Sequence, residues 1–95
     1  MHYRITKVHH QSGKQKDMVS HISSMQDKVD EIDGLISVHL ISISDTESYG
    51  ISVYENEQKI IDAEAQFKEI MAGMIPFMTA PPEICTGGVL WHHTK

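Results

Sequence analysis

The feature that most constrains the fold is the order in which the spacing of apolar residues changes along the chain. Spacing typical of strands and of helices follows the order strand, helix, strand, strand, helix, strand. The predicted strands span 2–10, 35–43, 49–54 and 84–92, and the predicted helices span 12–32 and 56–76. This β-α-β-β-α-β order is the ferredoxin-like split motif. We therefore predict an α+β fold with one domain, residues 1–95, in which an antiparallel sheet of strand order 4-1-3-2 carries both helices on one face.

Each predicted helix has one apolar stripe. The stripes have members spaced three or four residues apart and comprise Met18, Ile22, Met25, Val29 and Ile32 in the first helix and Ile60, Ala63, Phe67, Ile70 and Met74 in the second. Ser12 and Gln15 match a capping box, and Asn56 is a good N-cap residue. Gly34 ends the first helix, and Pro76 ends or kinks the second. Both helices are thus expected to bury one side against the sheet.

The second strand is apolar on both of its faces. Strict alternation places Ile36, Val38 and Leu40 on one face and Leu35, His39 and Ile41 on the other. A sheet with helices on one side normally shows polar residues on the other side. Since the chain has no further element to cover that side, a second copy is the simplest cover, and we expect a homodimer.

Charge and composition exclude several classes of function. The chain has 8 Lys and Arg against 13 Asp and Glu and shows no basic stripe, so nucleic acid is not an expected partner. No apolar run approaches the ~20 residues of a membrane span, and the first residues lack a signal peptide, so we expect a cytoplasmic protein without membrane contact. The single cysteine, Cys85, cannot form an intramolecular disulfide and reads as a small hydrophobic residue.

Three stretches, together with the order of elements, resemble a known family. They are GLI at 34–36, ISVYENE at 51–57 and PPEICTGGVL at 81–90. The pattern is similar to the dimeric α+β barrel proteins and, more narrowly, to the antibiotic biosynthesis monooxygenase-like domains. This resemblance implies a homodimer with a small-molecule cavity between the sheet and the helices of each protomer.

The resemblance also implies an activity. Enzymatic members oxidise polycyclic phenols or quinols without metal or flavin, so no cofactor is expected. Another branch degrades haem with an asparagine on the first strand, a tryptophan and a histidine. Here Asn56 lies at a predicted helix cap and Trp91 on the last predicted strand, so none of those roles is carried over.

His39 is the candidate catalytic residue. It lies among apolar residues in the middle of a strand, where burial would leave a neutral imidazole able to act as a base on a phenol. The alternative is a structural hydrogen bond inside a dimer interface. The candidate ligand-binding residues are Tyr3, Tyr54 and Trp91, which could shape an aromatic pocket or simply belong to the core.

The sequence has seven histidines, and they suggest a second kind of site. In the predicted sheet His2 lies near His92 and His93, but two histidines without a third ligand make a poor metal site, and none is expected. The leading hypothesis is therefore a homodimer that binds a small aromatic or apolar molecule and oxidises it without a cofactor. The alternatives are a non-catalytic ligand-binding or interaction module and a haem-binding relative.

Overall fold

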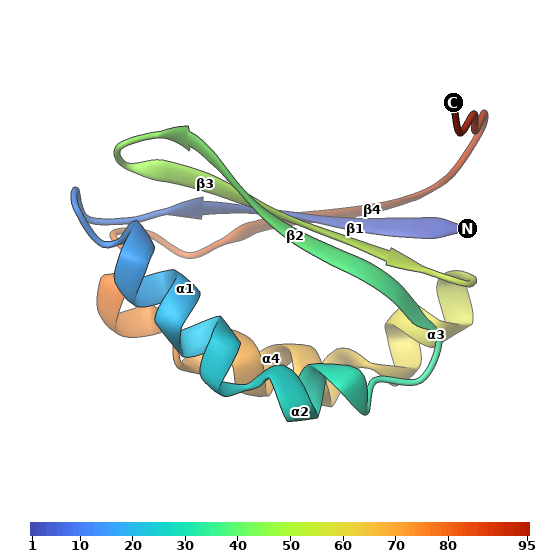
Figure 1. Ribbon diagram of the computed structural model, residues 1–95, viewed down its shortest axis with the longest axis horizontal. Helices are drawn as coiled ribbons and strands as arrows, with labels where there is room; N and C mark the ends of the chain where they lie inside the picture. The colour runs from blue at the N-terminus through green and yellow to red at the C-terminus, as the bar shows by residue number, and fades with distance from the viewer.

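The computed structural model covers residues 1–95 and contains one four-stranded sheet with helices on one side (Figure 1). In chain order the elements are β1 (His2–His9), α1 (Gln15–Ser24), α2 (Gln26–Asp30), β2 (Leu35–Ser44), β3 (Glu47–Tyr54), α3 (Glu57–Asp62), α4 (Glu64–Ala72), the 3-10 helix η1 (Ile75–Phe77) and β4 (Glu83–Gly88). No helix is long and apolar enough to cross a membrane.

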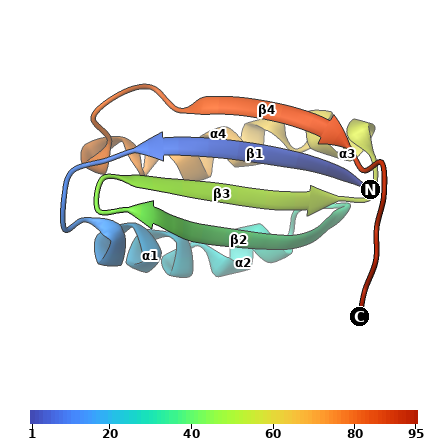
Figure 2. The same ribbon diagram turned by 90° about the horizontal axis from the view of Figure 1, so that it is seen from above.

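The sheet confirms the predicted topology. Its strand order is β2-β3-β1-β4 and all three pairings are antiparallel, which is the predicted 4-1-3-2 order read from the other edge (Figure 2). The β1–β3 register pairs Ile5 with Ile51, and the β1–β4 register pairs Ile5 with Cys85. β1 and β3 are therefore the central strands, and their side chains form the middle of each face of the sheet.

Each predicted helix is present but interrupted by one residue. Met25 separates α1 from α2, and Ala63 separates α3 from α4. Gly34 follows α2 with φ of 80°, a left-handed conformation that glycine adopts without strain, as predicted. Asn56 caps α3, since its Oδ1 accepts a hydrogen bond from the Lys59 backbone amide at 3.0 Å. Pro76 lies in η1, just beyond the end of α4.

The predicted capping box at the start of α1 is wrong. The Ser12 hydroxyl donates instead to the carboxylate of Asp45. The Gln15 side-chain amide reaches β2, where it donates to Ser42 Oγ at 2.8 Å and to the Ser44 carbonyl at 3.0 Å. These hydrogen bonds connect the start of the helix to the β2–β3 turn. Because the partners are far apart in the sequence, the local spacing of residues could not predict them.

A bulge in β2 corrects the predicted division of its faces. The register shifts between Leu35 and Ser37, so that Leu35 pairs with Tyr54 and joins Val38 and Leu40 on the side of the helices. Ile36 is the extra residue and is exposed.

The last strand is shorter than predicted. It ends at Gly88, and residues 89–95 leave the sheet as a tail that rises on the side without helices (Figure 1). The glycines at 87 and 88 offer no side chains to hold the strand against a neighbour, which favours an end there. Leu90 and Trp91 consequently lie outside the sheet and are 102% and 81% exposed.

The core lies between the sheet and the helices in two clusters. One is formed by Ile32, Tyr54, Ile60 and Ala63, and the other by Val8, Met18 and Met74. Most of these residues belong to the predicted stripes, so the spacing identified the buried helix faces correctly.

Candidate functional site

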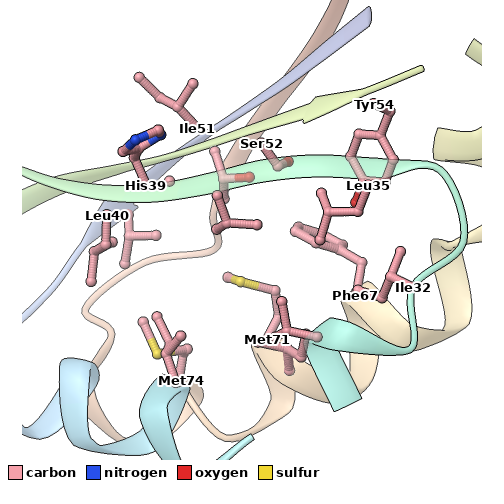
Figure 3. Close-up of a pocket in the computed structure, with 17 residues that line it drawn as sticks. Ile32, Leu35, His39, Leu40, Ile51, Ser52, Tyr54, Phe67, Met71 and Met74 are labelled. Atoms are coloured by element: carbon pink, nitrogen blue, oxygen red, sulfur yellow. The ribbon is translucent and has the colours of Figure 1, made fainter. Parts of the chain in front are cut away.

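A partly open cavity is lined by members of both core clusters. It lies between the sheet and the helices and has a volume of about 90 Å³ (Figure 3). Of its 17 lining residues, 13 are hydrophobic, which makes it an apolar site. Water in a largely apolar lining finds few hydrogen-bond partners.

Small residues on the central strands create the cavity. Thr6, Gly50 and Ser52 occupy neighbouring positions on the face toward the helices: Thr6 pairs with Gly50, and Ser52 is the next residue of β3 on that face. A Cβ on Gly50 would lie 3.7 Å from the Cβ of Thr6, an ordinary contact distance, so the site has room for an added methyl group. The sheet therefore leaves unfilled volume beneath its centre.

Helix side chains close the cavity from the other side. The residues that line it from the helices and the turns that follow them are Ile22, Val29, Ile32, Phe67, Ile70, Met71 and Met74. Figure 3 shows Met71 and Met74 below the sheet, facing Leu35 and Leu40 across the space. Methionine side chains are unbranched and flexible, so this wall can adjust to a ligand more readily than one of branched residues.

Behind one end of the cavity lies a buried arginine. Arg4 is 2% exposed, and its Nη1 donates to the Tyr54 hydroxyl oxygen at 3.1 Å while its Nη2 donates to the Ile60 carbonyl at 3.2 Å. Its guanidinium carbon lies 3.9 Å from the centre of the Phe67 ring, within cation–π range. The nearest carboxylate oxygen, from the exposed Glu64, is 3.8 Å away. Tyr54 and Phe67 both line the cavity, so Arg4 contacts both aromatic residues at this end of it.

The structure places His39 differently from the prediction. His39 is one of the residues that line the cavity, but its side chain is exposed, not buried, and Figure 3 shows its ring above β2, on the opposite side of the strand from Leu40 and the cavity interior. His39 pairs with Ile51, and both side chains belong to the face of the sheet that the helices leave uncovered. The premise of burial is therefore wrong for the single chain, and a role of His39 as a base stays a prediction.

The three predicted ligand-binding residues do not come together. Tyr54 is 2% exposed and lines the cavity. Tyr3 pairs with Val53 and Gly87 and points to the uncovered face. Trp91 lies in the tail, where its ring stacks on that of His93 with centroids 5.9 Å apart. Only Tyr54 is thus in position to meet a ligand in the cavity.

The histidines have separate structural partners. His10 is 1% exposed; its Nδ1 lies 2.9 Å from the Gln11 carbonyl and its Nε2 lies 2.9 Å from Ser48 Oγ. Because a carbonyl only accepts, Nδ1 carries the proton and donates it. His21 Nε2 lies 2.9 Å from the Ile70 carbonyl and so joins α1 to α4. No group of three or more His, Cys, Asp or Glu residues is arranged to hold a metal.

Two ion pairs on the surface shift the pKa values of Glu83, Asp33 and Lys59. His9 Nε2 lies 2.7 Å from Glu83 Oε2, and this hydrogen bond, with the charge of Lys7, lowers the pKa of Glu83 below its usual 4.5. Lys59 donates to Asp33, which lowers the pKa of Asp33 and raises that of Lys59. None of these four residues lines the cavity, so we assign neither ion pair a part in ligand binding.

Sequence reasoning missed Arg4 and the small residues of the two central strands. Arg4 was not among the predicted site residues, although an arginine at an inward strand position is itself a signal, because a buried charge needs specific partners. The alignment of Thr6, Gly50 and Ser52 depends on the strand register, which the sequence pattern alone does not give.

Comparisons with solved structures agree with the fold. No family model matches the chain, and no curated protein sequence matches it. A monooxygenase from the gene ActVA-Orf6 of Streptomyces coelicolor, in complex with nanaomycin D, superposes with a TM-score of 0.80 at 17% identity, covering 99% of this chain and 91% of the other. SnoaB, a cofactor-independent oxygenase from Streptomyces nogalater, gives a TM-score of 0.80 at 12% identity, covering 99% and 97%.

A third structure, named as an antibiotic biosynthesis monooxygenase from Nitrosomonas europaea, gives a TM-score of 0.77 at 13% identity and covers 96% of this chain and all of its own. At this level of identity the similarity establishes the fold. The resemblance to the antibiotic biosynthesis monooxygenase-like domains is thus confirmed as a likeness of architecture across the whole chain.

Proposed function

We propose that the protein binds a small apolar molecule, aliphatic or aromatic, in the cavity between its sheet and its helices. The observation that carries this proposal is the cavity lining, in which 13 of 17 residues are hydrophobic. A ligand there would contact Leu40 and Met74 without having to replace the hydrogen bonds of ordered water.

The volume of the cavity limits the size of the ligand. It is about 90 Å³, smaller than the engineered cavity of about 150 Å³ that binds benzene. A single ring therefore fits only if flexible side chains such as Met71 and Met74 move aside. A haem is far larger than this space, and we do not propose haem binding.

We further propose that two copies of the chain pair through the uncovered side of the sheet, which we call the open face. Its residues, taken from the strand register, are Tyr3, Ile5, Lys7, Ser37, His39, Ile41, Tyr49, Ile51, Val53 and Cys85. The middle of this face is apolar, and Ile41 is 41% exposed. A twofold pairing would cover these residues with the same patch of a second copy, and His39 would then lie in the interface.

Oxidation of the ligand without a cofactor is the second candidate function. It is supported by the likeness to a cofactor-independent oxygenase. The cavity itself favours simple binding, because no carboxylate lines it and the ring of His39 points away from it (Figure 3). A base that activates a phenol must lie within hydrogen-bond reach of the hydroxyl proton.

Methyl NMR tests ligand binding directly. With methionine methyl groups labelled with carbon-13, titration with benzene should shift the signals of Met71 and Met74, which line the cavity, and leave that of the exposed Met1 unchanged. Equal small shifts of all methionine signals, or none, would contradict the proposal. Oxygen consumption during titration with a monocyclic phenol separates oxidation from binding alone.

A further inference from the structure

The polar end of the cavity is built from two buried side chains. Arg4 and Tyr54 are each 2% exposed, and the Arg4 Nη1 group donates to the Tyr54 oxygen at 3.1 Å. Tyr54 reaches from β3 toward the helices, with Leu35 and Phe67 near its hydroxyl end (Figure 3). Arg4 thus lies behind the tyrosine, whereas Tyr54 itself faces the cavity.

The hydroxyl hydrogen of Tyr54 has no acceptor within the chain. A phenol oxygen can accept hydrogen bonds and can donate one. The only side-chain hydrogen bond of Tyr54 is the one that it accepts from Arg4. An arginine cannot accept a hydrogen bond, so the Tyr54 hydrogen must point elsewhere.

Arg4 also strengthens this free donor. Its charge is only weakly compensated, because Glu64 is exposed and its carboxylate lies 3.8 Å away. A hydrogen bond from a cation to a hydroxyl oxygen polarises the O–H bond, which makes that hydroxyl a better donor to a third group. Since Tyr54 lines the cavity, its hydroxyl is a polarised hydrogen-bond donor beside an otherwise apolar space.

We propose that this end selects ligands with one carbonyl oxygen on an otherwise apolar ring, held by the Tyr54 hydroxyl that Arg4 positions. The proposal rests on the proposed binding of a small apolar molecule and names its chemical class. A neutral ketone or aldehyde supplies an acceptor without a donor of its own. A carboxylate would have to lose far more hydration than one hydroxyl can replace.

Two other hydroxyl groups that line the cavity provide control positions. Thr6 and Ser52 also line the site, but neither hydroxyl forms a side-chain hydrogen bond with a cation. Thr6→Val and Ser52→Ala remove these hydroxyls with little loss of volume. Tyr54→Phe removes the proposed donor and keeps the ring.

Ligands of the same shape test the proposal. Cyclopentanone and methylenecyclopentane differ only in an oxygen or a methylene group on the ring, and their dissociation constants are measured from the Met71 and Met74 methyl signals. Tyr54→Phe should weaken binding of the ketone about tenfold, as expected for one hydrogen bond, and change binding of the alkene by less than about twofold. Comparing each ligand between proteins cancels the different hydration of the two ligands. Thr6→Val and Ser52→Ala should leave the ketone within about twofold of its wild-type affinity if the Tyr54 hydroxyl is the donor.

The outcomes separate the two proposals. If neither ligand binds to the wild-type protein, the proposed function fails and this inference falls with it. If both bind and Tyr54→Phe alters them equally or not at all, only the carbonyl preference is overturned. A loss of ketone affinity in Thr6→Val or Ser52→Ala as large as that in Tyr54→Phe would also overturn it.

An infrared measurement on the wild-type protein needs no variant. The carbonyl stretch of bound cyclopentanone should lie below its frequency in a hydrocarbon solvent, because a hydrogen bond weakens the C=O bond. Arg4→Met should move the band back toward the hydrocarbon value, and Arg4→Lys, which keeps a cation, should restore part of the shift. A wild-type band at the hydrocarbon value would contradict the proposal.

Discussion

Thr6 and Gly50 lie opposite each other on the two central strands, and a Cβ on Gly50 would come within 3.7 Å of the Thr6 Cβ. Both positions face the helices beneath the middle of the sheet. Most sheets fill such positions with large apolar side chains, since interiors are packed as densely as organic crystals. The small residues here leave the space in which we propose that a ligand binds.

Filling this space should stabilise the protein and block the ligand. Ser52 lines the cavity, and its hydroxyl group forms no hydrogen bond with another side chain. Ser52→Val therefore adds apolar contacts without leaving a buried polar group unpaired. We expect a gain of about 0.5–2 kcal/mol in the free energy of unfolding, measured in urea, and at least a tenfold loss of benzene affinity. Ser37→Val, on the open face of the neighbouring strand, is the control and should leave benzene affinity unchanged. Unchanged benzene affinity in Ser52→Val would place the ligand elsewhere.

Enlarging the cavity should have the opposite effect on stability. Met74 is 2% exposed and packs against Val8 and Met18. Met74→Ala should lower the free energy of unfolding by about 2–5 kcal/mol, because it removes buried contacts and leaves a larger void. The neighbouring Ile75 is 63% exposed, and Ile75→Ala should change stability by no more than about 0.5 kcal/mol. Similar losses in both variants would show that Met74 does not belong to a packed core.

The ion pair between His9 and Glu83, at the start of β4, predicts that the stability of the folded protein depends on pH. The hydrogen bond from His9 and the charge of Lys7 lower the pKa of Glu83 in the folded protein from 4.5. The resulting stabilisation is present above the unfolded pKa and is lost as the pH falls through the lower folded pKa. His9→Ala should move the Glu83 pKa back toward 4.5, as measured by carbon-13 NMR of the carboxyl group. His2→Ala, at the other end of β1, should not move it, and an unchanged Glu83 pKa in His9→Ala would refute the assignment.

The open face predicts the oligomeric state. Ile5 lies on a central strand between Ile51 and Cys85 on that face. The wild-type protein should have twice the mass of one chain by multi-angle light scattering, and Ile5→Lys should yield single chains, because it buries two lysines near a twofold axis. Ile61→Lys, at a 56% exposed position on α3, should leave the mass unchanged. A monomeric wild type, or an Ile5→Lys variant with twice the mass of one chain, would contradict this arrangement.

The fold was largely predictable because it depends on spacing. Period-two strands and stripes such as that of Met18 to Ile32 are short-range patterns, and the order of the elements then limits the topology to the one observed. The errors came from long-range or irregular features. Gln15 bonds to β2 rather than to its own helix, and the bulge beside Leu35 changes which side chains face the helices.

The site was predicted far less well than the fold. Of the predicted site residues, Tyr54 lines the cavity with its side chain, whereas His39 and Tyr3 point to the open face and Trp91 lies in the tail. Apolar neighbours in sequence suggested burial for His39, yet its face of the sheet has no cover within one chain. The partnership of Arg4 with Tyr54 joins residues 50 positions apart, which no local pattern reveals.

Xenon binding in a crystal shows whether the cavity accepts an apolar guest. Xenon occupies dry apolar cavities and needs no polar contacts. We expect a xenon atom between the sheet and the helices, in contact with Leu40, Ser52 and Met71. A pressurised crystal with no xenon at that position, or with xenon only on the open face, would contradict the proposal that this cavity is the binding site.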